Sequence, residues 1–322
     1  MLSNATPQSQ WEECINRTKH KEELIFVSLY VLIFIAGLVL NLIALVVFFC
    51  HTKTRSHTTV YMTNLALADL FLVCMLPVRI YYHLGFQHIP QRLCDITNMV
   101  LLINMYGSIF LLSCMSADRG VAVCFPMSLR VRQARKKAPL VCLAVWMMTV
   151  CASLPIYISR PQVNLRQTQC FGSFPVYATR TVTVTSSLTV GFGGPLIVLL
   201  VSSLGLIRAI RQSQAAQTEL VDSQKIQRMI AVCLVIFLAC FLPYHLSLWL
   251  IYLNQTFITC SLVDSYRYGL MVACLNAMLD PLVYYFTTET FRQRVDRSVL
   301  QQMRLTQGQS SEENNRSRAL NT

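Results

Sequence analysis

Polar side chains that need partners occur inside apolar stretches of this sequence. Asp69 lies in NLALADL, and Asp280 lies with Asn276 in LNAMLDPLVYYF. Asn104 and Ser108 are four residues apart, as are Asn276 and Asp280, so on a helix the members of each pair share a face. Two carboxylates among amides and a hydroxyl, without an obvious cation, indicate a bound Na⁺ or a proton shared by the two acids. An interhelical hydrogen-bond network is the alternative, and the two are compatible.

An acid and a base stand side by side where another apolar stretch ends. They are Asp118 and Arg119, and Gly120 follows them. Adjacent opposite charges can hold each other in one state of a protein and separate in another, which indicates a switch. The alternative is a helix that leaves the membrane, where any charge can sit. Glycine costs about 1 kcal/mol of helix stability relative to alanine, so we expect Gly120 to loosen the pair.

Three arginines stand near the opposite ends of apolar stretches. Arg79 follows Pro77 by two residues inside such a stretch, whereas Arg180 and Arg267 lie nearer the ends of theirs. Guanidinium groups bind phosphate and carboxylate in a bidentate manner, so these arginines favour an anionic ligand. The alternative is that Arg180 and Arg267 extend to lipid headgroups. Arg79 lies deeper and fits a ligand better.

The elements that must position these residues are membrane-spanning helices. The 322 residues are 54% hydrophobic and 13% charged, and the mean hydropathy of +0.48 is too high for an ordinary soluble domain. A helix needs roughly 20 apolar residues to cross about 30 Å of hydrocarbon. Barrel strands would alternate, and these runs do not. The expected fold is an all-α membrane protein with seven spans, near 24–50, 58–84, 94–125, 138–159, 181–207, 229–253 and 262–287.

The distribution of lysine and arginine indicates how the bundle is oriented. The loops after the first, third and fifth spans carry 11 of these residues, and the loops on the opposite side carry four. The positive-inside rule therefore predicts an extracellular N-terminus and a cytoplasmic tail. The formal net charge of +12 then reflects topology and attraction to anionic lipid, not nucleic-acid binding.

Glycosylation signals and four cysteines fall in the predicted outer segments. Asn4 and Asn16 each begin an Asn-X-Thr motif ahead of the first span, and we predict that both are glycosylated. The four outer cysteines allow three pairings. Pairing Cys94 with Cys170 would pin the loop between spans four and five over the bundle. Pairing Cys14 with Cys260 would then tie the N-terminal segment to the last outer loop.

The chain resembles the rhodopsin-like (class A) G-protein-coupled receptors, because each span carries at least one landmark of that family and the landmarks follow in the family's order. The landmarks are Asn41, Asp69, Cys94, the Asp118-Arg119 pair, Trp146, Pro195, Phe237, Pro243 and the DPLVY motif from Asp280 to Tyr284. They cover nearly the whole chain. The resemblance implies a plasma-membrane receptor that activates heterotrimeric G proteins, has arrestin and receptor kinases as further partners, and is not an enzyme.

The resemblance also implies roles for single residues. Arg119 would swing from Asp118 to a G protein when the sixth helix moves outward, and Tyr284 would turn toward the opened cleft. The connector beneath the ligand would consist of Ile109, Pro195, Phe237 and Phe241. Three regions follow: an extracellular glycosylated N-terminus at 1–23, the receptor domain at 24–287, and a cytoplasmic amphipathic helix 8 with the tail at 288–322. No cofactor is expected apart from the structural Na⁺.

Local stretches narrow the ligand class that the resemblance implies. Leu101 stands where amine receptors carry an acid, and Cys274 stands where retinal proteins carry a lysine. LPVRIYYHL, NMYGSIF and FLPYHLSL look like the purinoceptor-like branch and its lysophospholipid receptors. Nucleotide receptors carry a basic residue three positions after the histidine of the sixth helix, whereas Leu248 follows His245 here.

We therefore expect an anionic ligand, above all a lysophospholipid. The expected ligand-binding residues are Arg79, Tyr82, Tyr106, Arg180, His245 and Arg267, with Met105, Phe192 and Leu248 adding to an apolar slot. Ordinary bundle packing is the alternative for each of the aromatic residues. Nucleotides or small carboxylates as ligands, signalling without a ligand, and a seven-span transporter remain alternative functions.

Overall fold

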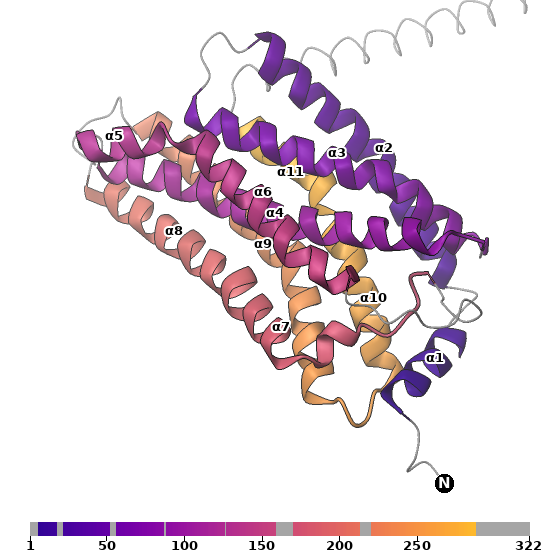
Figure 1. The fold of residues 1–322 in the computed structure, drawn as a ribbon. Coiled ribbons are helices and arrows are strands. Elements are labelled where there is room, and N and C mark those ends of the chain that lie inside the picture. The colour runs from indigo at the N-terminus through magenta and orange to yellow at the C-terminus, as the bar shows by residue number, and fades with distance from the viewer. Residues whose placement is uncertain are drawn as a thin grey trace, which may run out of the picture.

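The computed structural model describes residues 6–17, 22–51, 56–86, 88–125, 127–158, 170–212 and 220–287, and within these ranges it contains helices and turns but no strand (Figure 1). The elements are α1 (Pro7–Arg17), α2 (Glu22–Val46), η1 (Val47–His51), α3 (His57–His83), α4 (Gln91–Cys124), α5 (Leu129–Arg135), α6 (Ala138–Ile158), η2 (Val176–Thr179), α7 (Thr181–Ser186), η3 (Ser187–Gly193), α8 (Gly194–Gln212), α9 (Leu220–Leu253), α10 (Cys260–Cys274) and α11 (Asn276–Thr287).

These helices confirm the all-α bundle and its seven predicted spans. Five continuous helical stretches are long and apolar enough to cross a membrane, and a sixth qualifies when α5 and α6, which meet at 50°, are counted together. The seventh span is divided into α10 and α11. The sixth span qualifies over Ile226–Leu253, close to the predicted bounds, and its helix α9 begins earlier, at Leu220. The predicted eighth helix and tail lie outside the described residues.

A proline interrupts the hydrogen bonding within α11, the second part of the seventh span. Pro281 has no N–H to donate to the carbonyl of Ala277, four residues earlier, so α11 lacks that hydrogen bond. Asn41 of α2 supplies a replacement, because its Nδ2 donates to the Ala277 carbonyl at 2.7 Å and to the Gly37 carbonyl at 2.9 Å. The first and seventh spans are thereby joined deep in the bundle.

A second proline changes the helix of the fifth span. Pro195 cannot donate to the carbonyl of Gly191, and the residues just before it, Ser187–Gly193, form the π-helical segment η3. The hydroxyl of Ser113 on α4 donates to the Pro195 carbonyl at 3.3 Å. The widened turn therefore lies against α4, and it shapes the cavity described below.

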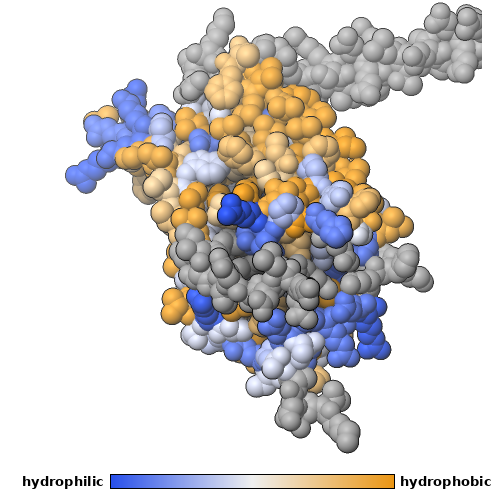
Figure 2. All heavy atoms as spheres, turned by 45° about the vertical axis from the view of Figure 1, so that its right-hand side comes forward, coloured by the Kyte–Doolittle hydropathy of each residue, from blue (hydrophilic) through white to orange (hydrophobic). Residues whose placement is uncertain are grey.

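The outer surface is apolar, as a lipid environment requires. Phe71, Val201 and Val235 are 58%, 63% and 65% exposed, whereas the bundle interior holds fully buried residues such as Leu112 and Phe237. Hydrophobic residues cover most of the upper part of the visible face, and hydrophilic ones lie across its middle and lower part and at the upper left (Figure 2). A soluble protein would not expose so much contiguous apolar surface.

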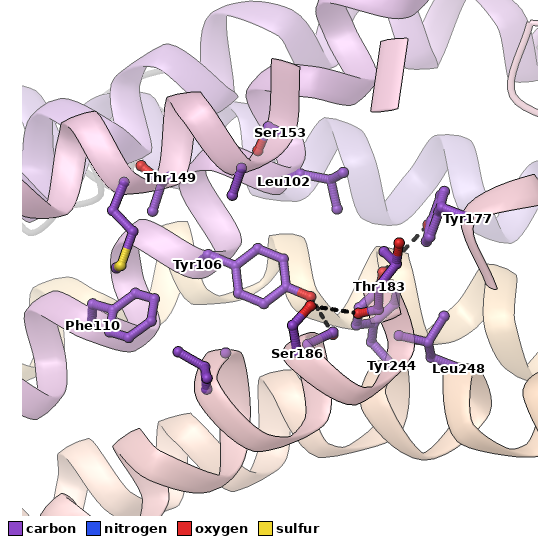
Figure 3. A pocket seen from close by; sticks show the side chains of 15 residues that line it. Leu102, Tyr106, Phe110, Thr149, Ser153, Tyr177, Thr183, Ser186, Tyr244 and Leu248 are labelled. Atoms are coloured by element: carbon purple, nitrogen blue, oxygen red, sulfur yellow. Dashed lines mark hydrogen bonds between the residues drawn. The ribbon is translucent and has the colours of Figure 1, made fainter. Parts of the chain in front are cut away.

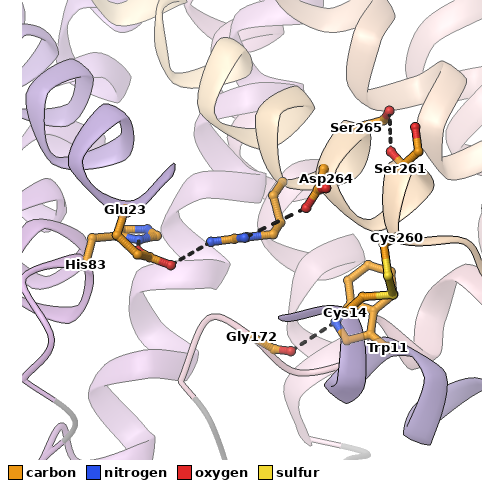
Figure 4. Close-up of polar contacts among 10 residues, drawn as sticks. Trp11, Cys14, Glu23, His83, Gly172, Cys260, Ser261, Asp264 and Ser265 are labelled. Carbon is orange, nitrogen blue, oxygen red and sulfur yellow. Dashed lines mark hydrogen bonds and ion pairs between the residues drawn. A yellow bond between two sulfur atoms is a disulfide. The ribbon is translucent and has the colours of Figure 1, made fainter. Parts of the chain in front are cut away.

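Two disulfides fasten the end of the bundle that carries α1, and both are the predicted ones. Cys14 bonds Cys260, and Cys94 bonds Cys170. The first bond holds α1 against the start of α10, where the indole Nε1 of the buried Trp11 donates to the Gly172 carbonyl at 2.9 Å (Figure 4).

The N-terminal glycosylation prediction remains untested. Asn16 is exposed in the last turn of α1, while Asn4 lies outside the described residues.

Candidate ligand pocket and signalling switch

A cavity of about 170 Å³ lies among α4, α6, η3 and α9 (Figure 3). It is lined by Leu102, Tyr106, Phe110, Met148, Thr149, Ala152, Ser153, Tyr177, Thr183, Ser186, Ser187, Val190, Gly191, Tyr244 and Leu248. Leu102, Tyr106 and Phe110 are spaced four apart, so one face of α4 forms a wall. Of the predicted ligand residues, Tyr106 and Leu248 line this cavity.

The hydroxyl groups around the cavity are bonded to one another. The Tyr106 hydroxyl lies 2.6 Å from Oγ of Ser187, and the Tyr177 hydroxyl lies 3.3 Å from that of Tyr244 (Figure 3). Tyr177 also bonds the hydroxyl of Tyr266. These pairs satisfy the polar tips of the tyrosines, and the rings and aliphatic side chains are left to face the cavity. The cavity is therefore suited to an apolar ligand group.

The cavity reaches the bilayer-facing surface. Met148 of α6 and Val190 of η3 both line it, yet they are 41% and 60% exposed on spans that cross the membrane. At the end of the bundle that carries α1, Trp11 packs edge-on against Tyr266 at 5.6 Å between ring centroids, and Tyr266 bonds the lining residue Tyr177. The exposed lining residues Met148 and Val190 indicate that the cavity opens sideways between α6 and η3.

Arg79 is a buried cation near the C-terminal end of α3, which is predicted to be extracellular. Its side chain is 4% exposed, Nη2 donates to Oδ1 of Asn98 at 2.6 Å, and the guanidinium lies 4.5 Å from the ring centre of Phe171. Its Nε has no hydrogen-bond partner, and no carboxylate of the described residues forms an ion pair with it. A buried cation without a counter-ion is costly, which favours an anion arriving from outside.

The partner of Arg79 lies about one turn from the cavity wall along α4. Asn98 precedes Leu102 by four residues, and Tyr106 and Phe110 continue the same spacing. Residues four apart are neighbours on a helix, offset by about 40° around its axis, and the segment from 98 to 110 is ~18 Å long at 1.5 Å per residue. A single elongated molecule can therefore have an anionic end at Arg79 and an apolar end in the cavity.

Like Arg79, the other two predicted arginines do not line the cavity, and their role in ligand binding stays a prediction. Arg267 donates from Nη2 to Oε1 of Glu23 at 2.9 Å, and its Nη1 lies 4.0 Å from Oδ1 of Asp264. Arg180 is exposed at the junction of η2 and α7. Sequence reasoning missed Glu23, and the available signal was an acid at the very start of an apolar run.

The remaining predicted ligand residues lie behind the cavity wall. His245 is buried, its Nδ1 lies 2.8 Å from the carbonyl oxygen of Phe241, and its ring stacks on Phe192 at 4.6 Å. Tyr82 packs edge-on against Phe171 at 5.2 Å, close to Arg79. Met105 is buried in the core and does not line the cavity. For these residues the packing alternative describes what the structure shows.

The predicted interior polar site contains unsatisfied oxygen atoms. Nδ2 of Asn104 donates to Oδ1 of Asp69 at 3.0 Å, whereas the second oxygen of Asp69, both oxygens of Asp280 and the hydroxyl of Ser108 have no hydrogen-bond partner in the described structure. The side-chain amide of Asn276 is likewise buried without a partner. Asp69 and Asp280 are fully buried and near enough for their charges to interact. Such a set of oxygen donors fits a small hard cation or a shared proton.

The acid of the predicted switch has a different partner from the expected one. Asp118 accepts from Nε and Nη2 of Arg135 at 2.7 and 3.0 Å and from the Thr58 hydroxyl at 3.1 Å. The bond to Asp118 raises the pKa of Arg135 above its usual value. Nε of Arg119 is buried and has no partner among the described residues. In this structure Asp118 is therefore held by Arg135 of α5, whose planar fork matches a carboxylate, and a switch between Asp118 and Arg119 stays a prediction.

The geometry agrees with a comparison to known proteins. The family model described as "7 transmembrane receptor (rhodopsin family)" matches residues 40–284. This chain belongs to that family. Lysophosphatidic acid receptor 6 of Mus musculus is 35% identical over 311 residues, with 92% of this chain and 88% of the relative covered.

Two further relatives have similar identities. Lysophosphatidic acid receptor 4 of Homo sapiens is 34% identical over 277 residues, covering 82% and 75% of the two chains. The uracil nucleotide/cysteinyl leukotriene receptor of Homo sapiens is 35% identical over 291 residues, covering 87% and 78%. The chain is thus a multi-pass plasma-membrane receptor that couples to G proteins, and it is not an enzyme.

In this receptor the predicted connector residues are packed together. Phe237 stacks on Phe192 at 5.1 Å and meets Phe241 edge-on at 5.7 Å. Ile109 is fully buried, and its carbonyl accepts from the Ser113 hydroxyl that also reaches Pro195. These contacts join α4, η3, α8 and α9 between the cavity and the cytoplasmic end. Farther toward that end, the buried Tyr284 packs edge-on against Phe48 at 5.4 Å.

Proposed function

We propose that this receptor binds an extracellular lysophospholipid and activates G proteins in response. The observation that carries the proposal is the buried Arg79, unpaired with any carboxylate of the described residues and one helical turn above an apolar cavity that opens to the bilayer. A lysophospholipid has an anionic headgroup and one acyl chain, which match these two parts. The lateral opening between Met148 and Val190 suits a ligand that arrives from the membrane.

The relatives support the lipid proposal and keep one alternative open. Two of them are named for lysophosphatidic acid, and a third is named for uracil nucleotides and cysteinyl leukotrienes. A nucleotide carries several negative charges and a polar sugar. Arg79 is the one buried arginine near the extracellular end that the described residues leave without a carboxylate, and the adjoining cavity is apolar. These features favour a lipid.

Activation would proceed as a shift between two packings of the bundle. An agonist can favour the active packing only by its higher affinity for it. A lipid that joins Arg79 on α3 to the wall formed by Tyr106 and Leu248 contacts α9, whose connector residues lie just below. Outward movement of the cytoplasmic end of α9 would then expose Arg119 to the G protein. In this mechanism the N-terminus is extracellular. Arrestin and receptor kinases would act on the cytoplasmic tail and end the signal.

A cation or a shared proton would hold the inactive packing. Na⁺ would be bound by oxygens of Asp69, Asp280, Ser108 and the two nearby amides of Asn104 and Asn276, which otherwise remain buried without enough partners. The positive charge would offset the cost of burying two acids together. Movement of α11 relative to α3 would dismantle this site during activation.

G-protein dissociation in cells that express the receptor tests the proposal. The panel contains 1-oleoyl lysophosphatidic acid, lysophosphatidylserine, lysophosphatidylglycerol, uridine diphosphate and short-chain carboxylates. We expect a response to at least one lysolipid, and loss of that response in Arg79→Ala at equal surface expression. Arg180→Ala is the matched control, because Arg180 is exposed and does not line the cavity. A response to the nucleotide or carboxylates alone would overturn the proposal.

A further inference from the structure

Glu23 forms an ion pair with Arg267, the second arginine at the extracellular end of the bundle. Its Oε1 accepts from Arg267 at 2.9 Å, and its Oε2 is bonded to Nδ1 of His83 (Figure 4). The side chains of Arg267 and His83 are 11% and 5% exposed, so this cluster joins α2, α3 and α10 in a largely buried setting. Both carboxylate oxygens of Glu23 are engaged.

The carboxylates around Arg267 leave little positive charge for a ligand. Glu23 contacts the Arg267 guanidinium directly, and Asp264 lies 4.0 Å from it. Arg79 has a neutral partner, Asn98. The charge of Arg267 is therefore balanced by Glu23 and Asp264. Of the two arginines, Arg79 is the one whose positive charge an anionic headgroup can meet.

The Glu23 cluster lies close enough to the Arg79 site to influence it. The Arg79 guanidinium stacks on Phe171, whose ring meets Tyr82 at 5.2 Å. Tyr82 in turn meets the His83 ring at 5.3 Å, and His83 bonds Glu23. A headgroup bound at Arg79 is thus separated from the Glu23 carboxylate by the rings of Phe171, Tyr82 and His83, across which charges interact in a medium of low dielectric constant.

We propose that Glu23 is a specificity-determining residue, which makes the receptor prefer lysophospholipids whose headgroup carries one negative charge. This inference rests on the proposed lysophospholipid function. A phosphodiester carries one charge, whereas a phosphate monoester carries about −1.5 to −2 at pH 7. The first charge is matched by Arg79, and the second meets no available cation, because Glu23 already pairs with Arg267. Removal of the Glu23 charge frees Arg267 to meet a second negative charge.

Concentration–response curves for two lipids with the same oleoyl chain test this inference. The probes are lysophosphatidylglycerol, a phosphodiester, and lysophosphatidic acid, a phosphate monoester, with G-protein dissociation as the readout. In the wild type we expect the phosphodiester to be the more potent. In Glu23→Gln we expect the potency of the monoester to rise at least tenfold, about 1.4 kcal/mol, while that of the phosphodiester changes less than threefold.

Matched variants separate a local effect from a general one. Glu13→Gln makes the same change in net charge on the exposed face of α1 and is expected to leave the potency ratio unchanged. Glu23→Asp keeps the charge and is expected to retain the wild-type preference. If Glu23→Gln does not reach the cell surface, the relative potency of the two lipids on the wild-type receptor decides whether the inference holds.

The outcomes distinguish the two proposals. Equal or higher wild-type potency of the monoester, or a potency ratio that Glu23→Gln does not change, overturns the role of Glu23 and leaves the lysophospholipid function standing. Failure of both lipids and of lysophosphatidylserine on the wild type and on Glu23→Gln, at confirmed surface expression, overturns the proposed function and this inference with it.

Discussion

Replacement of Arg135 by glutamine should lower ligand-independent signalling. In the structure Arg135 holds Asp118 with two hydrogen bonds, and the neighbouring Arg119 has a buried Nε without a partner among the described residues. Without Arg135, the nearest cation for Asp118 is Arg119. The variant would therefore create the restraint that the native receptor lacks, and it would favour the inactive packing.

The structure indicates the size of this effect. The Asp118 side chain is 3% exposed and that of Arg135 is 24% exposed, so the carboxylate cannot simply be solvated when its partner is removed. A hydrogen bond between charged groups contributes about 1.5–3 kcal/mol. If Asp118 forms one with Arg119 in the inactive packing alone, the ratio of active to inactive receptor falls by about ten- to a hundredfold, at 1.4 kcal/mol for each factor of ten.

Basal G-protein dissociation, normalised to surface expression, measures this change. Arg132→Gln is the matched control, because Arg132 is an exposed arginine on the same helix. We expect its basal signal to equal that of the wild type. Unchanged or increased basal activity in Arg135→Gln would show that the Asp118–Arg135 pair does not govern the switch.

Three other outcomes are expected. Gly191→Ala should raise the lipid concentration for half-maximal response at least tenfold, because its Cβ would lie 2.7 Å from a ring carbon of Tyr106. Gly107→Ala is the control: its Cβ would meet nothing within 4 Å, so the dose–response curves should stay unchanged. Cys14→Ser should lower the free energy of unfolding in detergent by about 2–5 kcal/mol, and with it the melting temperature. An unchanged melting temperature would contradict this. Increasing Na⁺ should weaken agonist potency in the wild type but not in Asp280→Asn; equal sensitivity would exclude a sodium role for that acid.

Features that depend on apolar runs and on covalent pairing were predictable from the sequence. Seven runs of sufficient length predict seven spans, because lipid leaves the backbone no other way to satisfy its hydrogen bonds. Both disulfides follow from four outer cysteines once one pair is assigned. The stripe that includes Tyr106 was partly predictable, since a tyrosine deep in an apolar span invites a functional interpretation.

Features that depend on which side chains meet across helices were not predictable. Arg135 stands among four other basic residues of one loop, and nothing in their spacing marks it as the partner of Asp118. Glu23 and His83 are 60 residues apart, and their bond depends on how α2 packs on α3. The α6 wall of the cavity, which includes Thr149 and Ser153, resembles any other lipid-facing surface in sequence.

Photo-crosslinking of a lysophospholipid tests the central claim most directly. An oleoyl-length lysophosphatidylglycerol with a diazirine near the end of its acyl chain would be bound to the purified receptor, irradiated and located by peptide mass spectrometry. The account predicts labelling of α4, α6 and η3 near Phe110, Thr149 and Val190, with excess unlabelled lipid preventing it. Saturable labelling confined to the extracellular loops, or to lipid-facing helices away from this cavity, would contradict the account.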